Sequence, residues 1–117
     1  MGQEHSYLLT NKEDIQIIKV DDLLNEYENK RILKVVHHKM EEGFPNFIVD
    51  LSKIDYMNSV GLNFLISIKN RAEQLGGNMA IAHASEKIMQ LMEMTKLKPL
   101  FVLEQTIDNA FSKLKSI

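Results

Sequence analysis

The sequence predicts an α/β fold, with a four-to-five-stranded mixed sheet and helices packed mainly on one face of it. One observation is the alternation of short apolar runs with helical patterns, in the order ββαβαβαβα. Another is the run NFIVDLS at 46–52, which is apolar without alternation and therefore typical of a parallel strand buried on both faces. Because 117 residues are enough for one core, we expect a single domain over residues 1–117.

The first three elements are expected to be a hairpin and a helix. Residues 6–10 and 14–20 are rich in Leu, Ile and Val and are separated by the polar turn NKED, which is typical of two paired strands. A helix is expected over 25–42, where four apolar residues recur at helical spacing: Ile32, Val35, Val36 and Met40. Gly43 and Pro45 then end this helix.

The second half of the chain continues the alternation after the strand at 46–52. A helix is expected over 59–75, ended by Gly76 and Gly77, with an apolar stripe formed by Leu65, Ile68, Ala72 and Leu75. A strand at 78–84 follows, and Ser85 is expected to cap a third helix that runs to Met94. The last elements are a short strand at 97–103 and a closing helix at 106–117.

Composition excludes several classes of function. The chain has no cysteine, which rules out disulfides, cysteine zinc sites and thiol catalysis. Its net charge of −2 gives no electrostatic reason to expect nucleic acid as a partner. No apolar run approaches the roughly 18 residues of a membrane span, so we expect no membrane insertion and a cytoplasmic protein. Met1-Gly2 followed by Ser6 fits the loose myristoylation pattern, but so short a match is common by chance.

Residues able to carry catalysis are few. The four histidines are scattered, and the adjacent His37 and His38 diverge by about 100° on a helix, so we expect no metal site. The GxSxG elbow of serine hydrolases and the GK[ST] sequence of phosphate loops are both absent. Asp50 and Asp55 are the only candidate carboxylate pair for a small hydrolase or nucleotide-binding enzyme. We therefore expect no enzymatic activity and no cofactor.

The stretch at 50–64, DLSKIDYMNSVGLNF, contains the most unusual combination of residues. A strand ends at Asp50, and a helix opens at Asn58-Ser59, both of which are preferred N-cap residues. One interpretation is therefore that Ser59 simply caps the helix and has no other function. Gly61, in the first turn of the helix, costs about 1 kcal/mol relative to alanine, so this position must require either a close approach to other atoms or a bare backbone.

Four motifs in this half of the chain resemble those of the STAS domain, the fold of anti-sigma factor antagonists and of sulfate transporter tails. They read VDLS, NSVGL, AIAHAS and LMEMTKLKPLF, and the resemblance covers residues 7–115 in register. It implies the STAS fold for this chain. The free-standing length is similar to that of the antagonists of bacterial sporulation and general stress.

The resemblance also implies a mechanism in which Ser59 is the phosphorylation site. In that subfamily an anti-sigma factor that is also a serine kinase phosphorylates the serine, and a PP2C-type phosphatase removes the phosphate. The unphosphorylated antagonist binds the anti-sigma factor and frees the sigma factor, which is partner switching. Three residues depart from the family pattern: Asn58 replaces aspartate, Val60 replaces Ser/Thr, and Lys96 replaces glycine. The alternative is a STAS adaptor without phosphorylation, in a transport or sensory complex.

We expect the partner to bind at the start of the second helix. The expected contact residues are Asn58, Ser59, Leu62, Asn63 and Ile66. Ile66 lies off the apolar stripe of its helix, on the side where the Ser59 side chain projects, and an apolar residue on an exposed flank is typical of a docking surface. The alternative is that a neighbouring loop covers Ile66.

Overall fold

Five strands form one mixed sheet in the computed structural model, which describes residues 7–117. Strand order follows the chain, and only the pairing of the first two strands is antiparallel. The strands are β1 (Tyr7–Lys12), β2 (Ile15–Val20), β3 (Phe47–Asp50), β4 (Met79–Ala82) and β5 (Val102–Glu104). The predicted hairpin and the central position of the 46–52 strand are confirmed. Met1-Gly2, His5 and Ser6 lie outside the described residues.

Within the described residues, four α-helices and one 3-10 helix connect and cover the strands. They are α1 (Glu26–Glu41), α2 (Ser59–Gln74), α3 (Glu86–Met94), the 3-10 helix η1 (Lys98–Leu100) and α4 (Ile107–Lys115). The prediction of one strand over 97–103 is wrong in its first half, which forms η1. Pro99 lies in the first turn of η1, where its missing N–H and fixed φ are compatible with a helical turn, and the strand begins only at Val102.

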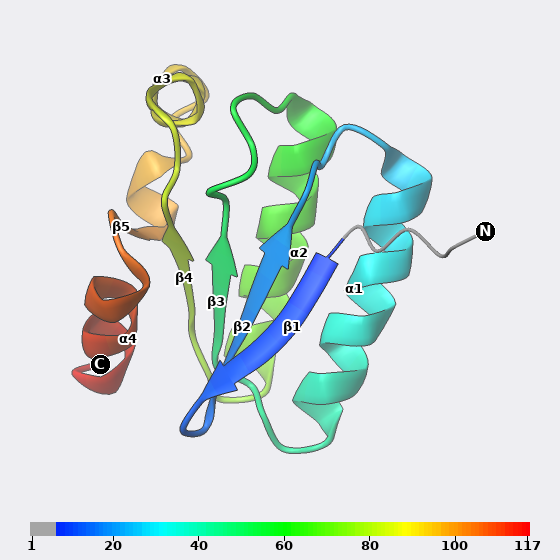
Figure 1. Cartoon of the computed structure of the whole chain (residues 1–117), viewed down its shortest axis with the longest axis vertical. Coiled ribbons are helices and arrows are strands. Elements are labelled where there is room, and N and C mark those ends of the chain that lie inside the picture. Colours follow the sequence, from blue (N-terminus) through cyan, green and yellow to red (C-terminus); the bar gives the residue numbers. More distant parts are fainter. Residues whose placement is uncertain (1–6) are drawn as a thin grey trace.

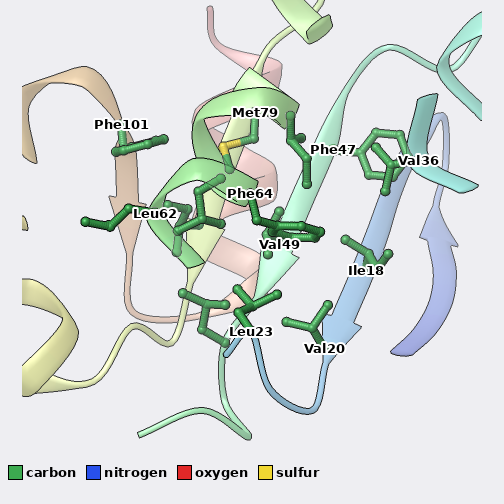
Figure 2. Packing of buried hydrophobic residues seen from close by; sticks show 14 of the residues in the cluster. Ile18, Val20, Leu23, Val36, Phe47, Val49, Leu62, Phe64, Met79 and Phe101 are labelled. Atoms are coloured by element: carbon green, nitrogen blue, oxygen red, sulfur yellow. The ribbon is translucent and has the colours of Figure 1, made fainter. Parts of the chain in front are cut away.

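Different helices cover the two faces of the sheet. Alternation along β3 directs Phe47 and Val49 into a large apolar cluster with α1, α2 and α3, and directs Ile48 into a smaller cluster with α4. Figure 1 shows α1 and α2 side by side, and Figure 2 shows Phe64 of α2 packed close to Val49. Three helices thus pack on one face and α4 on the other, as predicted for helices mainly on one face.

The α2 helix is buried over a wider arc than the predicted stripe. Leu65, Ile68 and Ala72 are fully buried as expected, whereas Leu75 is 41% exposed, because it is the C-cap residue beyond the last turn. No helix among residues 7–117 is both long enough and apolar enough to cross a membrane.

Candidate partner-binding site

The loop between β3 and α2 carries the candidate site at the carboxyl end of the central strand (Figure 1). Three of its residues, Leu51, Ile54 and Met57, are buried and attach it to the large cluster. At its start the Asp50 carboxylate accepts the Ser52 N–H at 3.0 Å, and the Ile54 N–H donates to the Leu51 carbonyl at 3.0 Å. Burial of every third residue and these two bonds hold the loop in one conformation.

A second set of contacts fastens this loop to the start of α3. Ser85 Oγ donates to the Asp55 carbonyl at 2.7 Å and also accepts the Ile88 N–H, so it caps α3 as predicted. Lys87 Nζ lies 3.0 Å from the Asp55 carboxylate. Asp50 is buried and bonded to its own turn, whereas Asp55 is exposed and paired with a lysine. This arrangement gives no support to a joint catalytic role for these two carboxylates.

Asn58, and not Ser59, is the cap of α2. The Asn58 side-chain oxygen accepts the Val60 N–H at 3.0 Å, and its backbone is extended, as an N-cap requires. Ser59 is therefore the first residue of the helix, and it is exposed. The interpretation of Ser59 as a mere cap is wrong, because the asparagine that replaces the family's aspartate supplies the capping oxygen.

The packing of the preceding loop beneath α2 explains why residue 61 is a glycine. A Cβ on this residue would lie 2.8 Å from Met57 Cβ, 3.0 Å from Met57 Sδ and 3.3 Å from Leu23 Cβ. These contacts are shorter than van der Waals distance, so only glycine lets the first turn of α2 approach the buried side chains of Met57 and Leu23 (Leu23 is labelled in Figure 2). A close approach therefore exists at Gly61, and it is made to side chains of the core.

The expected contact residues do not all lie at the surface. Asn58, Ser59 and Asn63 are exposed and are brought together in the first turns of α2. Leu62 is only 4% exposed and belongs to the large cluster, so little of its side chain is open to a partner. Ile66 is half-buried and packs partly against that cluster, so it is not the stranded apolar residue that the helical pattern indicated. The physical reason is that α2 is covered by the sheet, by α1 and by the preceding loop.

One polar residue at this site was missed by the sequence reasoning. Asn29 of α1 is 3% exposed, and its side-chain nitrogen donates to the Leu23 carbonyl at 2.9 Å and weakly to the Val60 carbonyl at 3.5 Å. It thereby connects the segment before α1 to the turn that follows Ser59. Its signal in the sequence was its position three residues before Ile32, on the buried stripe of α1.

Comparison with known proteins places this geometry in one family. A family model described as the STAS domain matches residues 7–110. The anti-sigma-B factor antagonist of Staphylococcus epidermidis is 30% identical over 88 residues, which are 75% of this chain and 82% of that protein.

Two solved structures share the fold. An anti-sigma factor antagonist structure from Thermotoga maritima has a TM-score of 0.85 at 20% identity, covering 95% of this chain and 96% of that one. The anti-sigma factor antagonist SpoIIAA in its unphosphorylated form has a TM-score of 0.79 at 15% identity, covering 95% of this chain and 97% of that one. A Bacillus SpoIIAA in the phosphorylated form has a TM-score of 0.72 at 14% identity, covering 92% of this chain and 97% of that one. At these identities the likeness shows the fold alone. Because the family model spans nearly all of the described residues, this chain belongs to the STAS domain family.

Proposed function

We propose that this chain is an anti-sigma factor antagonist whose binding is switched by phosphorylation of Ser59. The observation that carries the proposal is the Ser59 hydroxyl, which is exposed at the first position of α2 on a turn held by Asn58 and by the packing of Gly61. The antagonists among the relatives support the role. The motif NSVGL has a serine, Ser59, at the position that is phosphorylated in the antagonist motif, and this match supports Ser59 as the acceptor.

A phosphate on Ser59 changes the surface more than the fold. It adds about −1.5 to −2 charges and three acceptor oxygens. The N-terminus of α2 favours an anion, since the N–H groups and dipole of the first turn point toward it, and this turn holds no acidic residue. The carboxylate of Asp55, in the loop that precedes α2, is already paired with Lys87. The domain therefore accepts the phosphate, whereas a partner shaped around a hydroxyl must desolvate a dianion.

The proposed cycle has two further proteins. An anti-sigma factor with serine kinase activity binds unphosphorylated Ser59 and transfers phosphate to its hydroxyl, and a PP2C-type phosphatase restores the hydroxyl. Sigma-factor-dependent transcription then follows the fraction of chain that is unphosphorylated. In this cycle residues 1–117 act as one STAS domain in the cytoplasm, by binding rather than by catalysis.

Two substitutions at Ser59 test the switch. We expect Ser59→Ala to bind the anti-sigma factor kinase of the same genome as the wild type does. We expect Ser59→Asp to lose about 2–3 kcal/mol of binding free energy, or roughly thirty- to a hundred-and-fifty-fold in Kd, because a carboxylate must be desolvated in the interface. Calorimetric titration measures the affinities, and thermal unfolding verifies that both variants fold.

Ser52→Asp is the matched control, because Ser52 is exposed in the same loop but lies before the helix. We expect it to bind within about threefold of the wild type (on the scale where 1.4 kcal/mol is tenfold). Equal affinity of Ser59→Ala and Ser59→Asp, with no phosphate found on Ser59 after incubation with the kinase and ATP, would establish the unswitched adaptor instead.

Asn58 provides a separate test of the acceptor. Aspartate and asparagine are equally good N-caps, so Asn58→Asp should leave the melting temperature nearly unchanged. It adds the negative charge that the family motif has beside the acceptor, and we expect the initial rate of Ser59 phosphorylation to rise. The measurement is phosphate incorporation by intact-protein mass spectrometry over time. A slower or unchanged rate would show that this chain's kinase does not read that charge.

A further inference from the structure

The outer side of β5 is an open edge of the sheet with an apolar groove beside it. Within residues 7–117, β5 pairs with β4 alone and lies at the end of the sheet opposite β1 (Figure 1). A groove of about 820 Å³ is lined by Glu93, Lys96, Lys98, Pro99, Phe101 and Leu103. A smaller cavity of about 160 Å³ shares Leu103 with this groove and reaches Glu104, the last residue of the strand. The whole length of β5 is therefore accessible from this side.

The backbone of Leu103 is directed to this open side. The Glu104 carbonyl accepts the N–H of His83, the residue after β4, at 3.1 Å, so it points toward β4. In a strand the N–H and C=O of one residue point to one side, and those of the next residue point to the other side. The N–H and C=O of Leu103, the middle residue of β5, therefore point away from β4. They offer one donor and one acceptor to a further strand.

The two ends of this edge carry opposite charges. At its amino end Lys96 and Lys98 line the groove; Lys98 is paired with Glu93 at 3.0 Å, whereas Lys96 has no ion-pair partner among the described residues. At its carboxyl end Glu104 also lacks an ion-pair partner within residues 7–117. A second strand that runs antiparallel to β5 and carries the same charges would bring its acid to the basic end and its base to the acidic end.

We propose that two copies of this chain pair through the outer edges of β5, antiparallel and centred on Leu103. The N–H of each Leu103 donates to the C=O of the other, as in the hydrogen-bonded pairs of an antiparallel ladder. The two Leu103 side chains then lie side by side on the same face of the joined sheet, next to Phe101 in the groove. Lys96 of each copy faces Glu104 of the other, so both charges gain a partner.

The other edge of the sheet is less suited to a second copy. β1 is longer, with six residues, but the groove beside it is lined by two lysines, Lys34 and Lys39, and by a single acid, Glu42. In a pair related by a two-fold axis the same surface faces itself. The excess positive charge would therefore face an equal excess, and like charges opposite each other on paired strands are destabilising. Charge complementarity thus favours the β5 edge.

The proposed dimer leaves the candidate partner-binding site open. Ser59 lies beyond the carboxyl end of β3, and β4 separates β3 from β5 in the sheet. Because the two β5 strands run in opposite directions, the two Ser59 residues lie at opposite ends of the joined sheet. One dimer therefore presents two separate sites and can bind two partner molecules at once.

A charge exchange in sedimentation velocity tests the pairing. We expect the mass to rise from 13.5 kDa toward twice that value as the concentration of the chain is raised. Lys96→Glu or Glu104→Lys alone places like charges together at two symmetric contacts, and we expect each to raise the dimer Kd at least about fivefold. The double variant Lys96→Glu/Glu104→Lys should return to within about twofold of the wild type. Lys34→Glu, the same charge change on the exposed side of α1, is the matched control and should leave the Kd unchanged. Thermal unfolding verifies that all variants fold.

The Leu103 amide gives a readout that does not depend on substitution. Its N–H gains an acceptor only in the dimer, so we expect its hydrogen exchange by NMR to be slow in concentrated protein and fast after dilution. A chain that stays monomeric up to about 1 mM overturns the proposal, as does a dimer in which the Leu103 amide exchanges fast or the double variant does not recover. Protection of this amide only when the anti-sigma factor kinase is added assigns the edge to that protein and also overturns the dimer. None of these measurements depends on Ser59, so the proposed function is tested separately.

Discussion

Among residues 7–117, three helices are followed by the same hydrogen-bond pattern, and in one of them the left-handed residue is a lysine. After α1 and α2 the left-handed residue is a glycine, Gly43 with φ 111° and Gly76 with φ 82°. After α3 it is Lys96, with φ 63°. The Lys96 N–H donates to the Glu93 carbonyl and the Leu97 N–H to the Met92 carbonyl, which is a complete Schellman motif. Lysine in place of the family's glycine thus leaves these two hydrogen bonds intact, and its effect is on the free energy of folding.

Replacing this lysine should stabilise the protein. A side chain in the left-handed region costs roughly 1–2 kcal/mol, part of which is offset by the greater freedom of glycine in the unfolded chain. We expect Lys96→Gly to raise the free energy of unfolding by about 1 kcal/mol in urea denaturation. Lys96→Ala is the control: it removes the charge but keeps the Cβ, so a gain of equal size in both variants would contradict the backbone explanation.

Gly61 should show the opposite behaviour. In an open helix Gly→Ala stabilises by about 1 kcal/mol, but here the new Cβ would meet Met57 Cβ at 2.8 Å. Because that atom is fixed to the loop backbone, the first turn of α2 must move, and overpacking of this kind costs about 1–3 kcal/mol. We expect Gly61→Ala to unfold at lower urea concentration than the wild type. A higher midpoint urea concentration for Gly61→Ala would mean that the loop shifts at little cost in free energy.

At the scale of elements, the pairing of α1 with α2 contains a charge-sensitive contact. His37 of α1 is half-buried, and its Nε2 is covered and without a hydrogen-bond partner in the described part of the chain. Burial is the main cause that lowers the pKa of His37 below its usual 6.5, and the cation of Arg71 lowers it further, against the opposing effect of Glu41. Arg71 reaches across to Glu41 at 2.7 Å, so these three residues join the two helices.

This contact predicts a loss of stability in acid. The unfolded chain binds a proton on His37 near pH 6.5, whereas the folded chain binds it only at lower pH. Between the two values the unfolded state holds more protons, so the free energy of unfolding falls as the pH falls below about 6.5. We expect His37→Gln to lose less stability than the wild type between pH 7.5 and 5.5 in urea denaturation. Parallel curves for the two proteins would exclude His37 as the source.

The order and type of most elements could be predicted from the sequence, because their signals are local. The unbroken apolar run of β3 indicated a central strand, and Asn25, Ser85 and Thr106 mark helix starts by capping. The errors arose where several elements meet. Leu62 was placed at the surface because one helical stripe cannot show that α2 is also covered by α1 and by the preceding loop. The contact of Asn29 with the Val60 carbonyl was missed because it joins residues 31 positions apart in the chain.

At the scale of the whole molecule, β3 is the centre of both clusters. All four of its residues are buried, and it has a strand on each side, whereas β1 and β5 are edge strands. Opening the backbone of β3 requires the separation of both covers, so its amides should open only with global unfolding. We expect the amides of Ile48 and Val49 to be among the slowest in hydrogen exchange by NMR. Slower exchange in β1 would contradict this hierarchy.

The C-terminal helix is tied to the tip of the hairpin. Lys115 bonds Asp14 at 2.9 Å and lies 3.5 Å from Glu13, and Lys12 bonds Asp108 at 3.0 Å. The hydrogen bond and charge of Lys115 lower the pKa of Asp14, and Asp14 in turn is the main cause that raises the pKa of Lys115. Each of these side chains is exposed, so the contacts orient α4 more than they stabilise it.

These contacts between α4 and the hairpin indicate which end of the chain is suitable for a label. Lys115 lies beside the hairpin tip, at the amino end of β2, whereas Tyr7 pairs with Val20 at the carboxyl end of β2, the end of the sheet that carries Ser59 (Figure 1). A fluorophore, affinity tag or sensor surface attached after α4 is therefore held away from the candidate partner-binding site. A label attached ahead of β1 lies at the same end of the sheet as the candidate site. We expect such a label to hinder the binding of the partner protein.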